Sequence, residues 1–466
     1  MDFAAYDFWS KPVGLLSVGA ALSENGYDIS LVDCMDRNSP AFEQHRGTGA
    51  VRPPKSGRYG TGHYHKEIIP KPPILKSVPR RYGRYGVPLP LVWKALESGR
   101  RPDAVFVTSG MTYWYPGVVD MVSLLKKAYP GVPVVLGGIY ATLCHEHARR
   151  VSGADEVVKG EGECTAVRIA DALTGHRSEK TEYDTADDLP FLPYGLYPQL
   201  ESVVLLTSRG CPFRCPFCAS HLLCAGYRKR NPEKTADEVD NLRRTRNVAH
   251  FAFYDDALLF DKSNHLVPLL RELISRNLGA FLHTPNGIHP RWVDRELAHL
   301  MKRAGFKTIR LGYESGNPER QKSMGLKVTD EELTAATEFF LEAGFERSEL
   351  GAYVIMGLPG QTVEEILDSL VFVLKHGIKI SAASFSPIPG TACWDEAVHS
   401  GFVDENTDPL LTNNSIFPMK TDKVGYADFV RIGTLAALGN RIVGQGGMPL
   451  EHPEFRSRIQ QMLQTR

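Results

Sequence analysis

The stretch "TSRGCPFRCPFCAS" (207–220) places Cys211, Cys215 and Cys218 in one short loop, although the whole 466-residue chain holds only eight cysteines. Thiolates are the usual ligands of iron–sulfur clusters, and a [4Fe–4S] cube normally takes four of them. Three protein ligands leave one iron open, as a catalytic metal site leaves one position open for its substrate. The C-x3-C-x2-C spacing therefore favours a cluster that binds another molecule directly.

A structural zinc site is the alternative interpretation, with Cys224 as its fourth ligand. Zinc sites usually show paired C-x2-C units, or one such pair with two distant histidines. The step from Cys218 to Cys224 fits neither pattern, so the cluster is favoured. The scattered Cys34, Cys164 and Cys393 are predicted to be small buried residues.

Composition indicates an ordinary globular protein of two or three domains. Hydrophobic residues make up 42% and charged residues 23%, and 54 basic residues balance 54 acidic ones. A neutral chain gives no general reason to expect nucleic acid or a membrane as a partner. No apolar run reaches the roughly 18 residues of a spanning helix, and the start lacks a signal peptide. We therefore expect a cytoplasmic protein with reduced thiols.

The second half of the chain alternates between strand and helix patterns. Strands are predicted at 202–208, 250–255, 279–283, 307–312, 349–356 and 381–386. Helices are predicted at 233–246, 261–276, 291–304, 329–343 and 361–376. This order fits an open, partial (β/α)6 barrel, and the cysteines follow its first strand, where ligand-binding groups collect.

The first half also alternates, which predicts a doubly wound, Rossmann-like α/β sheet. A helix over 13–26 is followed by predicted strands at 27–34, 103–110 and 133–138 and by "ADEVVKGEGE" (154–163). The predicted organisation is an α/β domain (1–175), a linker (176–200), the barrel (201–391) and a C-terminal helical tail (392–466).

At the cysteine loop and the strand ends behind it, the chain resembles the radical S-adenosylmethionine (SAM) superfamily, over most of its length. The resemblance implies that the three cysteines hold a [4Fe–4S] cube and that SAM chelates the fourth iron, beside Phe217. An electron from an external flavodoxin or ferredoxin would then cleave SAM to methionine and a 5′-deoxyadenosyl radical. The cofactors would supply the chemistry and the protein their orientation.

Further SAM contacts are predicted at the ends of later strands. In "FYDDALL" (253–259), Asp255 and Asp256 would accept hydrogen bonds from the SAM ammonium; alternatively they are a helix N-cap and a first-turn acid. By resemblance, Glu314 and Ser315 of "RLGYESGNPE" (310–319) would meet the ribose or carboxylate. Gly357 of "VIMGLPGQTVEE" (354–365) would let its backbone run along the adenine.

The first half resembles the cobalamin-binding domain of the B12-dependent subclass. By resemblance, the corrin and its nucleotide tail would be lined by Ser109, Gly110, Gly137, Gly138, Gly160, Glu161 and Gly162. Alternatively, these glycines only form turns. No D-x-H-x-x-G segment offers a histidine as lower cobalt ligand. The apolar strand that usually opens this domain is missing before "YDFW", although the first strand of such a sheet is normally central.

A locally basic stretch, 52–85, carries tyrosines between its lysines and arginines, including Arg52 and Lys55. Such a stretch can bind nucleic acid, but a solvated loop, or one that contacts anionic parts of a ligand, is favoured because the chain is neutral. The expected function is a radical SAM reaction on a small molecule. Cobalamin-dependent methyl transfer to an unactivated carbon is the favoured reaction. A cobalamin-free rearrangement, cyclisation or RNA modification is the alternative.

Overall fold

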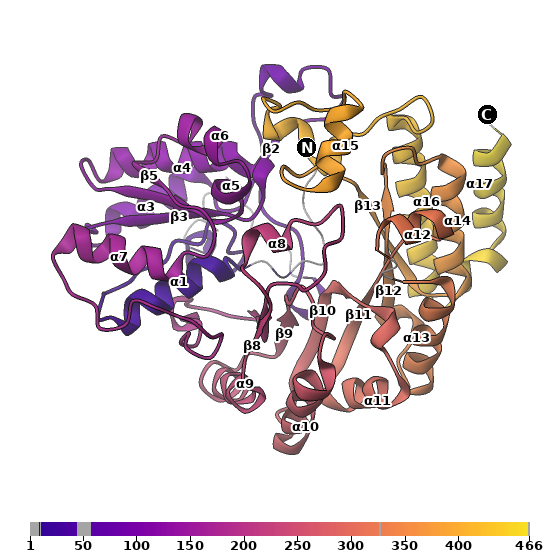
Figure 1. The fold of residues 1–466 in the computed structure, drawn as a ribbon, viewed down its shortest axis with the longest axis horizontal. Coiled ribbons are helices and arrows are strands. Elements are labelled where there is room, and N and C mark those ends of the chain that lie inside the picture. Colours follow the sequence, from indigo (N-terminus) through magenta and orange to yellow (C-terminus); the bar gives the residue numbers. More distant parts are fainter. Residues whose placement is uncertain (1–8, 10, 44–56, 326–327, 465–466) are drawn as a thin grey trace.

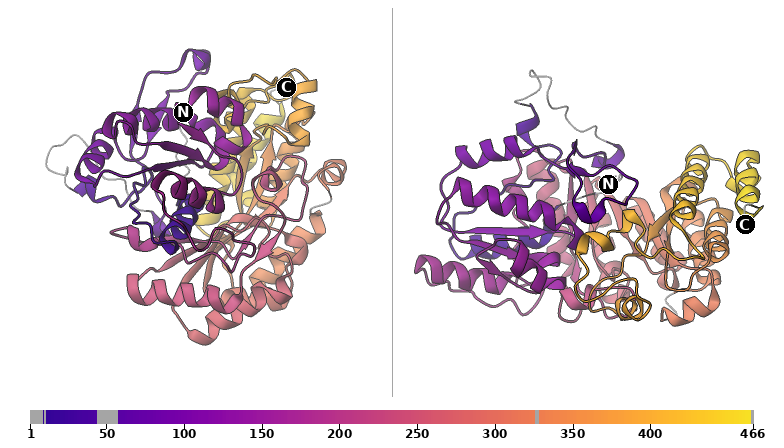
Figure 2. Two further views of the ribbon diagram at one scale, coloured as in Figure 1. Left: turned by 60° about the vertical axis from the view of Figure 1, so that its left-hand side comes forward. Right: turned by 90° about the horizontal axis from the view of Figure 1, so that it is seen from above.

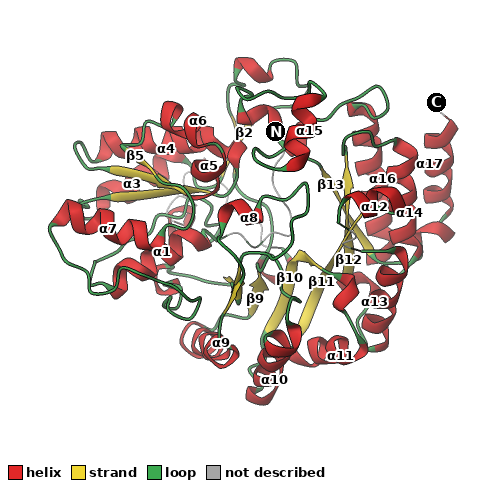
Figure 3. Cartoon of the chain, viewed as in Figure 1, coloured by secondary structure: helices red, strands yellow, loops and turns green. Residues whose placement is uncertain are grey.

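The computed structural model describes residues 9, 11–43, 57–325 and 328–464. Two α/β halves lie side by side, and the last two helices, α16 (Tyr426–Gly444) and α17 (Pro453–Gln464), pack on the flank of the second half that faces away from the first (Figures 1 and 2). Helices, strands and loops are distinguished in Figure 3. The opening residues 1–8 and the predicted basic residues Arg52 and Lys55 lie outside the described residues.

The second half is built on a six-stranded parallel sheet with the order β13-β12-β11-β10-β9-β6. Its strands are β6 (Ser202–Leu205), β9 (His250–Phe253), β10 (Phe281–Ile288), β11 (Phe306–Glu314), β12 (Leu350–Met356) and β13 (Lys379–Ser384). All six predicted strands are present, and neighbouring strands are parallel, as right-handed crossovers through helices require. The predicted partial (β/α)6 barrel is confirmed.

Helices cover the outer face of this sheet, and the strand side chains that face them are apolar and buried. Val203, Phe251 and Ile309 share one buried core with helix residues such as Leu270. The covering helices are α9 (Pro232–Arg246), α10 (Leu266–Arg276), α11 (Arg295–Ala304), α13 (Asp330–Glu342) and α14 (Val363–Lys375), and the short α12 (Pro318–Ser323) follows the carboxyl end of β11. The carboxyl ends of the strands are thereby left for the loops that carry the predicted site.

The C-terminal segment contains α15 (Ala392–His399), α16 (Tyr426–Gly444) and α17 (Pro453–Gln464). Helix α16 lies against the edge strand β13. The Asn440 side chain accepts a hydrogen bond from the Ile380 N–H at 2.7 Å and donates one to the Ile380 carbonyl at 2.7 Å. An edge strand exposes unpaired backbone groups, and Asn440 satisfies two of them here.

The first half contains a three-stranded parallel sheet, β3-β4-β5, formed by β3 (Val105–Ser109), β4 (Val134–Gly137) and β5 (Glu156–Val157). Its helices are α1 (Val13–Glu24), α2 (Pro40–Glu43), α3 (Leu89–Ser98), α4 (Tyr115–Ala128), α5 (Gly138–Leu143), α6 (His145–Val151) and α7 (Glu163–Thr174). Helices α1 and α7 pack on each other. The α/β architecture predicted for this half is confirmed.

The strand predicted at 27–34 is wrong. Residues 27–33 belong to no strand or helix, and within the described residues β3 pairs only with β4. The alternating side chains fit a strand, but a strand forms only where a neighbour pairs with its backbone. No described strand lies between this segment and β3, whose residues Val105–Thr108 remain only half-buried.

The described part of the basic stretch forms a short antiparallel hairpin, β1 (Lys66–Ile68) with β2 (Gly83–Tyr85). Arg84 lies 2.6 Å from Asp120 and 3.4 Å from Glu67, and Arg80 donates to the Ser415 carbonyl. Part of the positive charge of this stretch is therefore paired with other groups of the same chain. Across the described residues, no helix is both long and apolar enough to cross a membrane.

Candidate functional site

The cysteine loop begins and ends in a short antiparallel pair of two-residue strands at the carboxyl end of β6. Strand β7 (Ser208–Arg209) pairs with β8 (Arg228–Lys229), so Arg209 lies directly opposite Arg228. Gly210 follows with φ +75°, a left-handed conformation that favours glycine. Residues 210–227, with all three predicted cluster cysteines, therefore project from a narrow neck.

Contacts inside the loop hold it in a compact turn. The Cys218 N–H donates to the Cys215 carbonyl at 3.0 Å, and the Cys218 thiol donates to Ser220 Oγ at 3.3 Å, at the start of α8 (Ser220–Leu223). The three cysteines are half-buried, and burial raises the pKa of Cys211 to about 11. The charges of Asp256 and of the other two thiols add to this rise.

Two aromatic residues fix the loop to the barrel. The ring of Phe213 lies 4.9 Å from that of His289 and 5.3 Å from that of Trp292, both after β10. Phe217 packs on the apolar cluster around Ile355, Phe385 and Cys393 at the ends of β12 and β13. The loop thus spans the open ends of the strands, as the sequence predicts.

Within the described chain, no three His, Cys, Asp or Glu side chains converge as closely as ligands of a single metal ion. An iron–sulfur cube holds its thiolates farther apart than one ion does, so three cysteines spread over one loop suit a cube. Cys224, the fourth ligand of the zinc alternative, accepts a hydrogen bond from Arg228 at 3.3 Å and lies beside Gly210.

The two neighbouring aspartates after β9 have different surroundings. Asp255 is buried, and its Oδ1 accepts hydrogen bonds from the Thr207 N–H at 3.0 Å, the Thr207 hydroxyl at 2.8 Å and the Ser208 hydroxyl at 2.6 Å. The Asp256 side chain reaches the surface, but partial burial of its carboxylate raises its pKa, an effect that the nearby Ser220 opposes. Asp255 therefore holds the strand end in front of the cysteine loop, and Asp256 faces the loop.

The end of β11 contains a backbone distortion at Glu314. The register with β12 slips between Gly312 and Glu314, and Glu314 has φ +69°. A non-glycine residue in this conformation costs about 1–3 kcal/mol and tends to occur at functional sites. Ser315 is fully buried, and its hydroxyl bonds to Glu365 at 3.3 Å and to the Asn317 N–H at 3.2 Å. The Ser315 hydroxyl is thus engaged within the protein, and the SAM contacts of Glu314 and Ser315 stay predictions.

Gly357, at the end of β12, is required by packing. It has φ +85°, and a Cβ there would lie 2.7 Å from the ring of Phe417 in the C-terminal segment. The N–H groups of Gly357 and Leu358 both donate to the Gln361 side chain, at 2.7 and 3.1 Å. Packing against Phe417 thus explains why residue 357 is glycine, and its predicted role beside the adenine of SAM stays a prediction.

The glycines predicted to line the corrin fall into two groups. A Cβ on Gly138 would clash with Thr108 at 2.2 Å, and Cβ atoms on Gly110 and Gly162 would touch Trp114 and Val18 at 3.4 and 3.1 Å. Gly137 and Gly160 have no such neighbours within 4 Å. Within the first group, packing explains Gly138 and crowds Gly162, whereas the contact at Gly110 is an ordinary van der Waals distance. The second group leaves open space at the ends of β4 and β5 that suits a ligand.

Ser109 and Glu161 are engaged within the protein. The Ser109 hydroxyl donates to the Met111 carbonyl at 2.9 Å. Glu161 accepts from Arg209 at 3.2 Å and forms a shorter ion pair with Arg228. The Glu161 side chain therefore reaches from the first half to the neck of the cysteine loop, a contact that the sequence did not reveal because the partners are far apart in the chain.

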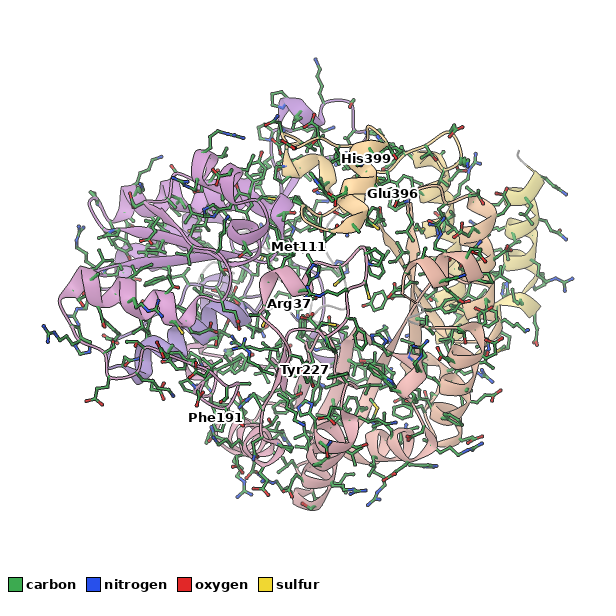
Figure 4. The ribbon with its side chains drawn as sticks, in the orientation of Figure 1. Arg37, Met111, Phe191, Tyr227, Glu396 and His399 are labelled. Atoms are coloured by element: carbon green, nitrogen blue, oxygen red, sulfur yellow. The ribbon has the colours of Figure 1, made fainter. Side chains whose placement is uncertain are left out.

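An open surface pocket of about 390 Å³ lies where the two halves meet. Its lining combines Thr142, Leu143, Lys159 and Gly160 of the first half with Leu222, Pro389 and Gly390 of the barrel half. In Figure 4, Met111 after β3 and Tyr227 of the cysteine loop are drawn along this border. The open space at Gly160 thus adjoins the helix that follows the third cysteine.

Two family models match separate parts of the chain. The B12 binding domain family model matches residues 92–170, and the radical SAM superfamily model matches residues 205–373. An uncharacterized methyltransferase of Pyrococcus horikoshii is 27% identical over 326 residues, which cover 64% of this chain and 70% of that protein. The cytidylyl-2-hydroxyethylphosphonate methyltransferase of Streptomyces wedmorensis is 22% identical over 462 residues, covering 84% and 79%.

Other matches are shorter or structural. The matched parts span about half, 47% and 53%, of two anaerobic magnesium-protoporphyrin IX monomethyl ester cyclases, from Synechocystis and Rubrivivax gelatinosus. Among solved structures, the radical S-adenosylmethionine methyltransferase TsrM of Kitasatospora setae has a TM-score of 0.62 at 16% identity, covering 85% of this chain and 74% of that one. At this identity the likeness supports the shared fold alone.

Proposed function

Since the chain belongs to the radical SAM superfamily and carries a B12-binding domain, we propose that it is a cobalamin-dependent methyltransferase that acts on an unactivated carbon of a small molecule. The observation that carries the proposal is the direct contact between the Gly160–Gly162 turn and the neck of the cysteine loop. This contact brings the two predicted cofactor sites to one border of the molecule. The methyltransferases among its relatives add support.

In this proposal Cys211, Cys215 and Cys218 would hold a [4Fe–4S] cube. When bound and reduced, the cube would supply the electron for the cleavage of SAM. Asp256 accepts a hydrogen bond from the SAM ammonium, because its carboxylate faces the loop and is not consumed by backbone donors. Asp255 instead keeps Thr207 and Ser208 in place, so that the loop starts from a fixed strand end.

The cobalamin would lie over the carboxyl ends of β4 and β5. Gly137 and Gly160 support this position, because no protein atom fills the space that their missing side chains leave. Ligands of open α/β sheets bind at such strand ends. Within the described residues, β3 has no partner on its other side, so the sheet there is narrower than a complete doubly wound sheet.

The proposed reaction needs two further molecules. Reduction of the cluster requires a low-potential donor, for which we propose a flavodoxin or ferredoxin. The substrate would bind between the two cofactors, and side chains of both halves would determine which molecule is accepted.

Anaerobic purification with hydroxocobalamin tests the proposal. The protein should retain about one corrin and one four-iron cluster per chain, measured by visible absorption and by iron and sulfide analysis. Reduced protein supplied with SAM should then release 5′-deoxyadenosine. A protein that cleaves SAM but retains no corrin would contradict the cobalamin part and favour the cobalamin-free alternative.

A further inference from the structure

We propose that Arg209 is a positioning residue. It holds the neck of the cysteine loop against the Gly160–Gly162 turn of the B12-binding domain, called the B12-domain turn below, and so fixes the cluster relative to cobalamin. This inference rests on the function proposed above. Arg209 is not itself a predicted ligand. It precedes Gly210 and Cys211, and all of its described ionic partners lie in the other half of the chain.

The guanidinium of Arg209 contacts three groups of the first half at once. Its Nη1 lies 3.2 Å from Glu161 Oε1, and its Nη2 lies 2.7 Å from Glu163 Oε1 and 2.6 Å from the hydroxyl of Ser17 on α1. The Arg209 side chain is 16% exposed and that of Glu163 is 7% exposed. An arginine fork can serve several acceptors in a fixed geometry, which a lysine ammonium cannot.

The cross-strand partner of Arg209 strengthens this link. Arg209 and Arg228 are directly opposite in the β7–β8 hairpin, and like charges in such positions repel each other. Glu161 Oε1 pairs with both arginines. The hairpin that closes the cysteine loop is therefore stabilised by a carboxylate from the B12-domain turn.

The same turn also carries the open space proposed for cobalamin. Gly160 precedes Glu161, and its N–H donates to the Thr142 hydroxyl at 2.9 Å. Glu163 begins α7, and the Arg209 charge lowers the pKa of its carboxyl although burial acts in the opposite direction. One short path thus runs from the turn, through Glu161 and Glu163, to Arg209 and the first cysteine.

Arg230 provides a matched control in the same hairpin region. Its Nη1 lies 2.6 Å from Glu238 Oε2, and the two side chains are 13% and 2% exposed. Both residues belong to the barrel half, so Arg230→Gln removes a comparably buried ion pair without touching the contact between the halves.

The test uses the full chain, reconstituted anaerobically with its cluster, as wild type, Arg209→Gln, Arg209→Lys and Arg230→Gln. The dissociation constant for hydroxocobalamin is measured by equilibrium dialysis. The SAM-induced change of the reduced cluster is measured by electron paramagnetic resonance. We expect Arg209→Gln to weaken hydroxocobalamin binding about five- to tenfold and to alter the SAM-induced spectrum. Arg209→Lys should lie in between, and Arg230→Gln should match wild type in both.

Wild-type affinity and an unchanged spectrum in Arg209→Gln would overturn the positioning role, as would equal effects in Arg230→Gln. If Arg209→Gln fails to fold, Glu163→Gln replaces it, because this substitution keeps the side-chain shape. Glu163→Gln should also weaken hydroxocobalamin binding and alter the SAM-induced spectrum. Wild-type behaviour of Glu163→Gln would overturn the proposal. A wild-type chain that binds neither cluster nor hydroxocobalamin would contradict the proposed function itself, and the two failures are therefore distinguishable.

Discussion

Gly210 and Gly226 touch through their backbones at the neck of the cysteine loop: a Cβ on Gly210 would lie 1.8 Å from the carbonyl oxygen of Gly226. The close approach brings the start and the end of the loop together, next to Cys211. Both glycines have positive φ, +75° and +69°, but only Gly210 meets another atom where its side chain would be.

Gly210→Ala should therefore prevent the loop from closing and abolish cluster binding. Gly226→Ala is the matched control, because it introduces a similar left-handed strain of about 1–2 kcal/mol without the clash. Iron and sulfide content after anaerobic reconstitution measures the difference. Equal cluster content in the two variants would show that the contact does not shape the loop.

Substitutions of Asp255 and Asp256 should have different effects: the first should lower stability and the second should weaken SAM binding. Asp255→Ala leaves the buried Thr207 N–H without its acceptor and should lower the free energy of unfolding by about 3 kcal/mol. Asp256→Asn should change that free energy by less than about 0.5 kcal/mol but weaken SAM binding. Urea unfolding and equilibrium dialysis with SAM check both effects. A larger loss of stability in Asp256→Asn would reverse the assignment.

Gly137→Val tests the position of cobalamin. Gly137 has no positive φ and no atom within 4 Å of an added Cβ, so the larger side chain should leave the fold intact. It should fill the space proposed for the corrin and weaken hydroxocobalamin binding at least about tenfold. Gly117→Ala on α4, which is equally unobstructed, serves as control. Unchanged binding in Gly137→Val would place the ligand elsewhere.

Glu163 should contribute to stability in a pH-dependent way. Its folded pKa lies below the ordinary glutamate value of about 4.3, so its contribution is complete above that pH and disappears as the pH falls through the folded pKa. Glu163→Gln should lower the free energy of unfolding by about 1.5–3 kcal/mol at neutral pH. The difference from wild type should shrink below about pH 4. A difference that is constant with pH would exclude an ionic contribution.

Much of the barrel could be predicted because its information is local. Buried runs such as 350–356 and periodic helices such as 363–375 identify themselves over short windows, and parallel strands need the helices between them. The segment 27–34 has an equally clear alternation but forms no strand. Whether such a segment becomes a strand depends on a neighbour that supplies backbone partners, and short windows contain no information on that neighbour.

The site was predictable in its residue types and less so in their roles. The cysteine spacing is local, but Asp255 and Asp256 are adjacent and differ only in which atoms surround them in the fold. The demand for glycine at 357 comes from Phe417, sixty residues away. The roles of Arg209 and Glu161 depend on contact between the two halves, which no motif encodes.

The most direct test of the central claim is anaerobic SAM cleavage by the Cys211→Ala, Cys215→Ala, Cys218→Ala triple variant, compared with wild type and with Cys224→Ala. The released 5′-deoxyadenosine is measured under reducing conditions, together with the absorption of the iron–sulfur cluster. We predict that the triple variant loses both signals and that Cys224→Ala keeps both. A triple variant that still cleaves SAM would contradict a three-cysteine cluster at the mouth of the barrel.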